Sequence, residues 1–250
     1  MHFKNNTWVQ SLNPSGAVLS VVVDNNVLAY GYRSAWGLSI HVRVLYEGEA
    51  RELLFDVSGD FSTWQHNAKL LRIDLGGIDA IVISHWHGDH AGALDGILNV
   101  IGRDIPIYAP LSFRRIFRET YGVIECGGAT EIFPGVFTTG TIGYMLAEHA
   151  LAIKVRNKGL VVLVGCGHPG VAHLVRSALN LAGEHRVNLV IGGFHISSRS
   201  SGAQVASELK ELGVERVSPM HCTGHEAKLS IKEVFGSRYI ESGAGKVIVV

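Results

Sequence analysis

The sequence predicts an α/β chain in which two strand-rich halves carry helices, with two β-sheets packed face to face and the helices outside. Short apolar runs with the spacing of strands alternate along the chain with longer segments of helical spacing. A second series of strands begins near the middle of the chain. The 250 residues are 47% hydrophobic, enough for one large core. We therefore expect a single domain over residues 1–250, with pseudo-symmetric halves at about 17–140 and 141–250.

The first half is predicted to open with strands and to place a helix before the next strand. Segments 38–46 and 51–55 are expected to form a β-hairpin, because Glu47-Gly48-Glu49 supplies a turn between two apolar runs. Apolar residues at helical spacing favour a helix over 61–71. The expected elements of this half are strands 17–23, 38–46, 51–55, 80–83 and 105–109 and helices 61–71 and 111–121.

The second half starts again with a hairpin and then alternates helices with strands. Asn157-Lys158-Gly159 is a good turn signal between two apolar runs. Gly213 is suited to end the preceding helix, because glycine readily adopts the left-handed conformation found there. The expected elements are strands 151–155, 160–164, 187–191, 214–218 and 246–250 and helices 171–182 and 204–212, with a short helix before the last strand.

Composition narrows the classes of function. Lysine plus arginine and aspartate plus glutamate both number 22, so no general attraction to nucleic acid or to an anionic membrane is expected. Three cysteines do not form a disulfide framework, and such a sparse, odd set favours a reducing compartment. We see no secretory signal and no apolar run of ~20 residues. We therefore expect a soluble, cytoplasmic protein with a small-molecule substrate, and the sequence leaves its oligomeric state open.

The segment from Ser84 to His90 carries four metal-capable side chains directly after an apolar strand. Imidazole and carboxylate are ligands that suit zinc and other divalent transition ions. His85 and His87 can reach one ion, and Asp89 and His90 can reach a second ion beside it, as in two-metal hydrolytic sites. The alternative interpretation is a histidine-rich surface turn, which the complete His-x-His-x-Asp-His pattern at a strand end disfavours.

Four apolar strands lead into a histidine, at His85, His168, His195 and His221. Ligands in α/β folds gather at the carboxyl ends of strands. A single such histidine is equally well explained as a buried core residue. Four of them, together with the segment after 80–83, indicate a functional site at one edge of the sheets.

At this point the chain resembles the metallo-β-lactamase superfamily, from about Ser20 to the C-terminus. Within it, the chain is similar to the branch that contains dihydropterin-type synthases of methanopterin biosynthesis. The resemblance implies a four-layer αββα sandwich of two mixed β-sheets, with metals in a cleft at one sheet edge. The segments that carry it are Ala35-Trp36-Gly37-Leu38-Ser39, Leu53-Leu54-Phe55-Asp56, Asn67-Ala68, 78–92 around the His-x-His-x-Asp-His motif, Gly165-Cys166-Gly167-His168-Pro169-Gly170, Gly192-Gly193-Phe194-His195 and Met220-His221-Cys222-Thr223-Gly224.

By this resemblance and by the local chemistry, His85 and His87 belong to a first metal site. Asp89 and His90 belong to a second site, which His221 closes. We expect two divalent ions; the histidine-dominated ligand set favours Zn²⁺, and Mn²⁺ or iron fits the same ligands.

The third ligand of the first site has three candidates. His168 is favoured. Cys166 stands near the position where the superfamily usually has a bridging ligand. The alternative interpretation of Cys166 is a small buried thiol without a ligand role. His149 stands near the usual upstream ligand position.

Three further roles concern residues around the ligands. Asp56 is interpreted as a carboxylate that orients a metal-bound histidine, with a helix or turn cap as the alternative. His195 is expected to face the cleft as a catalytic contact to substrate or transition state. Asp89 is expected to position the nucleophile and to manage its proton.

The leading hypothesis is a metal-dependent hydrolase, in which a hydroxide activated by two metals attacks an ester, phosphoester or related bond. The alternative, implied by the branch, is a metal-dependent transferase that joins a dihydropterin diphosphate to an arylamine, with the metals binding the diphosphate leaving group. A mono-iron dioxygenase and a non-catalytic metal-binding module are less favoured.

Overall fold

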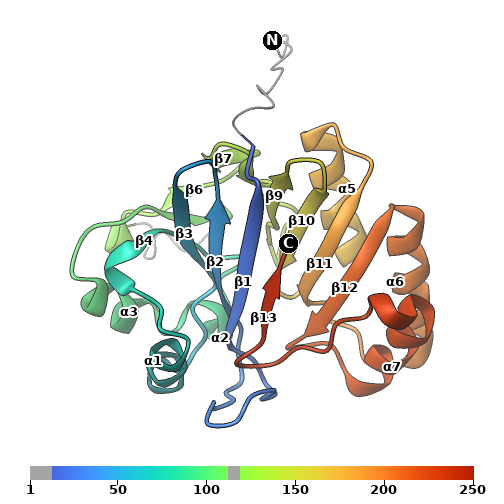
Figure 1. Ribbon diagram of the computed structural model, residues 1–250, viewed down its shortest axis with the longest axis horizontal. Helices are drawn as coiled ribbons and strands as arrows, with labels where there is room; N and C mark the ends of the chain where they lie inside the picture. The colour runs from blue at the N-terminus through green and yellow to red at the C-terminus, as the bar shows by residue number, and fades with distance from the viewer. Residues whose placement is uncertain (1–12, 112–118) are drawn as a thin grey trace.

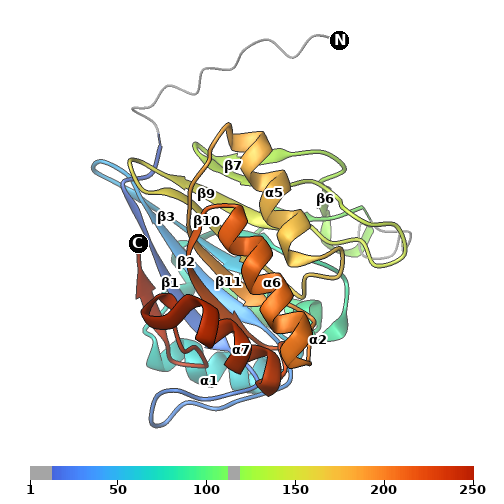
Figure 2. The same ribbon diagram turned by 90° about the vertical axis from the view of Figure 1, so that its right-hand side faces the viewer.

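Two β-sheets face each other at the centre of the molecule (Figures 1 and 2). The computed structural model describes residues 13–111 and 119–250. The strands of the first sheet are β1 (Gly16–Val23), β2 (Ser39–Leu45), β3 (Ala50–Phe55), β4 (Ile78–Val82), β5 (Ile107–Ala109), β6 (Ile124–Glu125) and β13 (Val247–Val249). The strands of the second sheet are β7 (Thr130–Phe133), β8 (Val136–Thr138), β9 (Leu151–Val155), β10 (Gly159–Val164), β11 (Val187–Gly193) and β12 (Val214–Met220).

Both sheets are mixed. The first has the order β13-β1-β2-β3-β4-β5-β6, antiparallel from β13 to β3 and parallel from β3 to β6. The second has the order β12-β11-β10-β9-β8-β7, parallel from β12 to β10 and antiparallel from there to β7. The C-terminal β13 therefore pairs with β1, so that the two ends of the described chain lie in neighbouring strands of one sheet (Figure 1).

Helices cover the outer face of each sheet. The first sheet is covered by α1 and α3, through Trp64, Ala68, Leu94 and Ile97. The second sheet is covered by α5, α6 and α7, which lie side by side in Figure 2. The helices are α1 (Phe61–Leu70), α2 (Gly88–Ala91), α3 (Leu94–Ile101), α5 (Val171–Ala182), α6 (Arg199–Glu211) and α7 (His225–Phe235), with short 3₁₀ turns η2 (Leu75–Gly77) and η3 (Gly236–Arg238). This four-layer arrangement confirms the predicted αββα sandwich.

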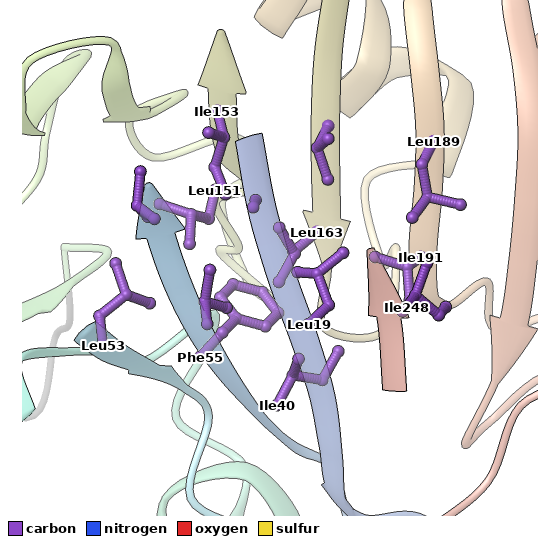
Figure 3. Close-up of a cluster of buried hydrophobic side chains, with 14 of the residues drawn as sticks. Leu19, Ile40, Leu53, Phe55, Leu151, Ile153, Leu163, Leu189, Ile191 and Ile248 are labelled. Atoms are coloured by element: carbon purple, nitrogen blue, oxygen red, sulfur yellow. The ribbon is translucent and has the colours of Figure 1, made fainter. Parts of the chain in front are cut away.

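The central core lies between the two sheets. Every second residue of β1 and β10 points into it, as Leu19, Val21, Val161 and Leu163 show. Phe55 packs among them in Figure 3, beside aliphatic side chains from both sheets. Because these side chains are fully buried, the hydrophobic effect fixes the sheets against each other and thereby fixes the strand ends that carry the polar residues.

Most predicted elements are confirmed to within a few residues. The helix predicted at 171–182 is α5 over its full length, and the Asn157-Lys158-Gly159 turn joins β9 to β10 with Asn157 and Gly159 at positive φ. Gly213 follows α6 at φ 75°, the conformation expected of a glycine after a helix. The predicted helix 111–121 lies largely outside the described residues.

The structure differs from the predictions in two places. The helix predicted to start at Gln204 starts at Arg199, because the Ser198 side chain accepts a hydrogen bond from the Ser201 N–H and caps it. Strands β6, β7 and β8 were not predicted. Strands β7 and β8 belong to the second sheet, and β13 belongs to the first. The division into pseudo-symmetric halves stays a prediction.

In the described part of the chain, none of the helices combines the length and the apolar character needed to cross a bilayer.

Candidate metal centre

A first group of imidazoles gathers where β4 and β10 end. His85 follows β4, and His87 is the residue at the N-terminus of α2. His168 follows β10, on the other sheet. Nε2 of His85 lies 3.0 Å from Nδ1 of His87 and 3.3 Å from Nε2 of His168. The three ligand atoms lie within 4.8 Å of one another, so a single ion can be reached by all three.

A second group lies beside the first. Oδ2 of Asp89 is 3.3 Å from Nε2 of His221 and 3.8 Å from Nε2 of His90. The two Nε2 atoms of His90 and His221 are 3.1 Å apart. His221 follows β12, so this group also joins residues from both sheets. The rings of His85 and His90 lie 4.1 Å apart between centroids, which brings the two groups next to each other.

The Cys166 thiol lies among both groups. Its Sγ is 3.3 Å from Nε2 of His90, and it shares one cluster of convergent donor atoms with His85 and His90 and another with His168 and His195. The neighbouring Cys222 thiol and burial raise the pKa of Cys166, so that without a metal the thiol stays protonated. A bound divalent ion would favour the thiolate.

The pKa values of His85, His168 and Asp89 suit metal binding. Burial lowers the pKa of His85 well below its usual range, and the nearby His90 acts in the same direction. Burial and the neighbouring His195 lower the pKa of His168 to about 4. Burial opposes ionisation of Asp89, but its hydrogen bond to His221 holds the pKa of Asp89 below its usual range. His85 and His168 therefore offer neutral imidazoles and Asp89 an ionised carboxylate, and donors of these kinds fit a divalent transition ion.

Asp56 lies behind the histidines at the end of β3. Its Oδ1 accepts the Ser84 N–H at 2.7 Å, and its Oδ2 accepts the Ser84 hydroxyl at 2.8 Å and lies 2.7 Å from Nδ1 of His90. The Ser84 hydroxyl in turn lies 2.9 Å from Nδ1 of His85. Nδ1 of His90 thus faces Asp56 directly, and Nδ1 of His85 faces the Ser84 hydroxyl that Asp56 holds. The Nε2 atoms of both rings face the cluster. Burial acts to lower the pKa of His90, but the Asp56 carboxylate outweighs it and the pKa is raised.

Two further buried carboxylates hold the backbone of the site, and sequence analysis missed both. Oδ1 of Asp24, at the end of β1, accepts the N–H of His221 at 2.7 Å. Glu148 accepts backbone N–H groups of the segment that carries His168. The available signals were that Asp24 ends the apolar run Val21-Val22-Val23 and that Glu148 stands next to a candidate ligand.

Backbone strain accumulates at the same place. Among the described residues, six other than glycine have positive φ, and four of them lie at this edge: Asp56, Ser58, His195 and His221. Such conformations cost about 1 kcal/mol or more each and persist where surrounding contacts enforce them. They are typical of functional sites, where side chains must be aimed in directions that regular structure does not allow.

The remaining predicted residues occupy two different environments. His195 follows β11 and is exposed, with its ring centroid 4.6 Å from that of His168. His149 is buried, and none of the clusters of convergent ligand atoms found in the described residues includes it. Burial lowers its pKa to about 3. His195 thus stands at the mouth of the centre, and His149 lies outside the cluster.

Comparisons with known proteins agree with this architecture. Residues 39–154 match the family model described as the metallo-beta-lactamase superfamily. A Methanocaldococcus jannaschii protein named 7,8-dihydropterin-6-methyl-4-(beta-D-ribofuranosyl)-aminobenzene-5'-phosphate synthase is 31% identical, over 87% of this chain and 92% of its own length. The crystal structure of Tm1679, titled a metal-dependent hydrolase of the beta-lactamase superfamily, superposes with a TM-score of 0.72 at 25% identity, over 93% of this chain and 98% of that one. A diphosphatase from the PhnP family, with a TM-score of 0.61 at 17% identity over 94% and 97% of the two chains, shares the fold.

Proposed function

This chain belongs to the metallo-beta-lactamase superfamily, and from that premise we propose that it is a metal-dependent hydrolase of a small-molecule substrate. The bond cleaved is an ester, phosphoester or related bond. The observation that carries the proposal is the pair of adjacent donor groups at one edge of the sandwich, each drawn from both sheets. The proposed ligands are His85, His87 and His168 for one ion and Asp89, His90 and His221 for the other, with Cys166 between them.

The donor chemistry favours zinc. Five imidazoles, a carboxylate and a thiol form a borderline-soft set, which suits Zn²⁺ better than Mg²⁺ or Ca²⁺. Two bound divalent ions would lower the pKa of a water molecule and polarise a substrate oxygen.

Three side chains, those of Asp89, Asp56 and His195, have further roles in the proposed mechanism. The Asp89 carboxylate keeps 21% of its side chain exposed, so it can hold the proton of an incoming water at Oδ2. The Asp56 carboxylate orients His90 directly through its Nδ1 atom and orients His85 through the Ser84 hydroxyl, which bridges Asp56 and Nδ1 of His85. The exposed ring of His195 is in a position to contact the substrate at the mouth.

A second candidate function is transfer. The relative that is 31% identical is a synthase whose name describes a dihydropterin joined to an aminobenzene. This similarity favours a reaction in which a dihydropterin diphosphate is joined to an arylamine. Metal ions held by the same residues would then bind the diphosphate leaving group, and an amine nitrogen would take the place of water as the nucleophile.

The proposal is tested with His87→Ala and Asp89→Asn, assayed on phosphodiester and ester substrates and on a dihydropterin diphosphate with and without an arylamine. Loss of one ligand or of the proton acceptor is expected to lower turnover by about 100-fold or more. His173→Ala, at an exposed residue of α5, is the matched control and should keep full turnover.

Two outcomes separate the candidates. Bond cleavage without an amine supports the hydrolase. A coupled pterin-amine product that forms only when the amine is present supports the transferase and overturns the leading proposal. Retained turnover in folded His87→Ala would contradict the proposed role of the metal centre in both reactions.

A further inference from the structure

We propose that Glu148 is a positioning residue, which fixes the segment from Cys166 to His168 and thereby places His168 at the metal centre. The inference rests on the proposed function, because it assumes that His168 is a metal ligand. It assigns to Glu148 no contact with metal or substrate.

The contacts of Glu148 are unusual for a single side chain. Its Oε1 accepts the N–H groups of Cys166 at 3.0 Å and Gly167 at 2.9 Å, and its Oε2 accepts the N–H of His168 at 2.8 Å. Three successive N–H groups thus point at one carboxylate. Gly167 has φ 73°, and a left-handed residue in such a run produces the concave arrangement of N–H groups that binds anions. The protein fills this concavity with its own buried carboxylate.

Glu148 also connects the two halves of the first donor group. His85 and His87 follow a strand of the first sheet, whereas His168 follows a strand of the second. The N–H of the next residue, His149, donates to the Ser84 carbonyl at 3.1 Å, directly before His85. The backbone at 148–149 therefore hydrogen-bonds to the segment that carries His85, and the Glu148 side chain hydrogen-bonds to the segment that carries His168.

The backbone of Glu148 is held independently of this side chain. Its N–H donates to the Ile142 carbonyl at 3.0 Å, and its own carbonyl accepts the Ile142 N–H at 2.9 Å. We therefore expect a substitution at 148 to leave the backbone bridge to Ile142 intact and to remove only the hydrogen bonds to the segment at 166–168.

Glutamine cannot replace this carboxylate without cost. Both oxygens of Glu148 accept N–H groups, and an amide has only one oxygen. Whichever way the amide is turned, its NH₂ group faces a backbone N–H donor. The segment must move, and the His168 ring moves with it.

The experiment is a Co²⁺ titration of metal-free wild type, Glu148→Gln and a control, followed by the visible absorption of the bound ion. Loss of a residue that orients a ligand costs metal affinity about 10- to 100-fold, and this loss is expected for Glu148→Gln. Glu131→Gln is the matched control. Glu131 lies on edge strand β7, and its carboxylate accepts one backbone N–H, that of Gly135. It should bind Co²⁺ as tightly as wild type.

A double-mutant cycle with His168→Ala separates positioning from a general structural effect. If Glu148 acts through His168, adding Glu148→Gln to His168→Ala should change Co²⁺ affinity by no more than about twofold. A further loss of tenfold in the double variant would overturn the inference. Should Glu148→Gln fail to fold without metal, the same cycle is run with Glu148→Asp, which keeps the charge but retracts it by one methylene.

The outcomes also distinguish this inference from the proposed function. Wild type that binds no Co²⁺ would overturn the metal centre and the role of Glu148 together. Wild type that binds Co²⁺ with an unchanged affinity in folded Glu148→Gln would overturn only the positioning role.

Discussion

Asp24, Asp56 and Glu148 are fully buried carboxylates that each hold one segment of the metal centre. Asp24 holds the backbone of His221, and Asp56 holds Ser84 and the His90 ring. Burying polar oxygen atoms is costly unless hydrogen bonds compensate, and each of these side chains accepts at least two. The arrangement suggests a centre whose ligands are set in place before metal arrives.

These carboxylates also show the limit of sequence reasoning at the scale of the residue. Asp56 was predicted because it ends the apolar strand Leu53-Leu54-Phe55, and the structure brings it to the His90 ring. Asp24 and Glu148 were not predicted. Asp24 binds a residue near the far end of the chain, and Glu148 binds backbone N–H groups, which every residue type except proline carries. No local spacing encodes such a contact.

Buried His149 gives a prediction about pH. Burial lowers its pKa from 6.5 to about 3, so between these values the unfolded chain binds a proton that the folded protein does not. The free energy of unfolding should therefore fall as the pH falls through this window. Between pH 6.5 and 5, His149 should account for roughly 1.5 kcal/mol of that decrease.

The measurement is denaturant unfolding of metal-free wild type and His149→Leu at several pH values. Comparing slopes against pH removes the constant cost of the substitution itself. His149→Leu should lose stability more gradually than wild type over pH 6.5 to 5. Identical slopes would show that His149 takes no part in acid sensitivity.

At the scale of the element, the parallel strands β10, β11 and β12 deliver His168, His195 and His221 to one edge. Sequence reasoning found these strands because they are apolar and bounded by glycine and polar residues. It missed β6, β7 and β8, which have only two to four residues each, too few to show a clear apolar pattern; β6 and β7 in addition carry only exposed or half-buried residues. Strands this short are defined by pairing with a neighbour more than by their own sequence.

Gly192 at the end of β11 tests how tightly these strand ends are packed. It has φ 133°, and a Cβ there would lie 1.7 Å from the carbonyl oxygen of Val164 on β10, its pairing partner. Gly192→Ala should lower the free energy of unfolding by about 3 kcal/mol, because the two strands must separate.

Gly128→Ala is the control for this substitution, since a Cβ at Gly128 would meet no atom within 4 Å. It should change stability by no more than about 0.5 kcal/mol. Thermal or denaturant unfolding of both variants provides the comparison. Equal stability of the two variants would mean that the contact between the ends of β10 and β11 is not the constraint described.

At the scale of the whole molecule, the metal centre lies where the two sheets meet. Each donor group combines residues that follow β4 with one residue from the second sheet, His168 in one group and His221 in the other. The hydrophobic core between the sheets therefore determines the spacing of the ligands. The sequence predicted the two sheets and the histidines at their strand ends from local patterns. It left open which of His168, Cys166 and His149 approaches His85, because the choice depends on how one sheet packs on the other.

The measurement that tests the central claim most directly is the metal content of the purified protein by elemental mass spectrometry. Wild type is compared with His87→Ala, His221→Ala and the exposed control His173→Ala. We predict about two divalent ions per chain in wild type and in the control, and about one in each ligand variant, because each substitution removes a ligand from a different donor group. Wild type with no bound metal, or ligand variants that hold as much metal as wild type, would contradict the account.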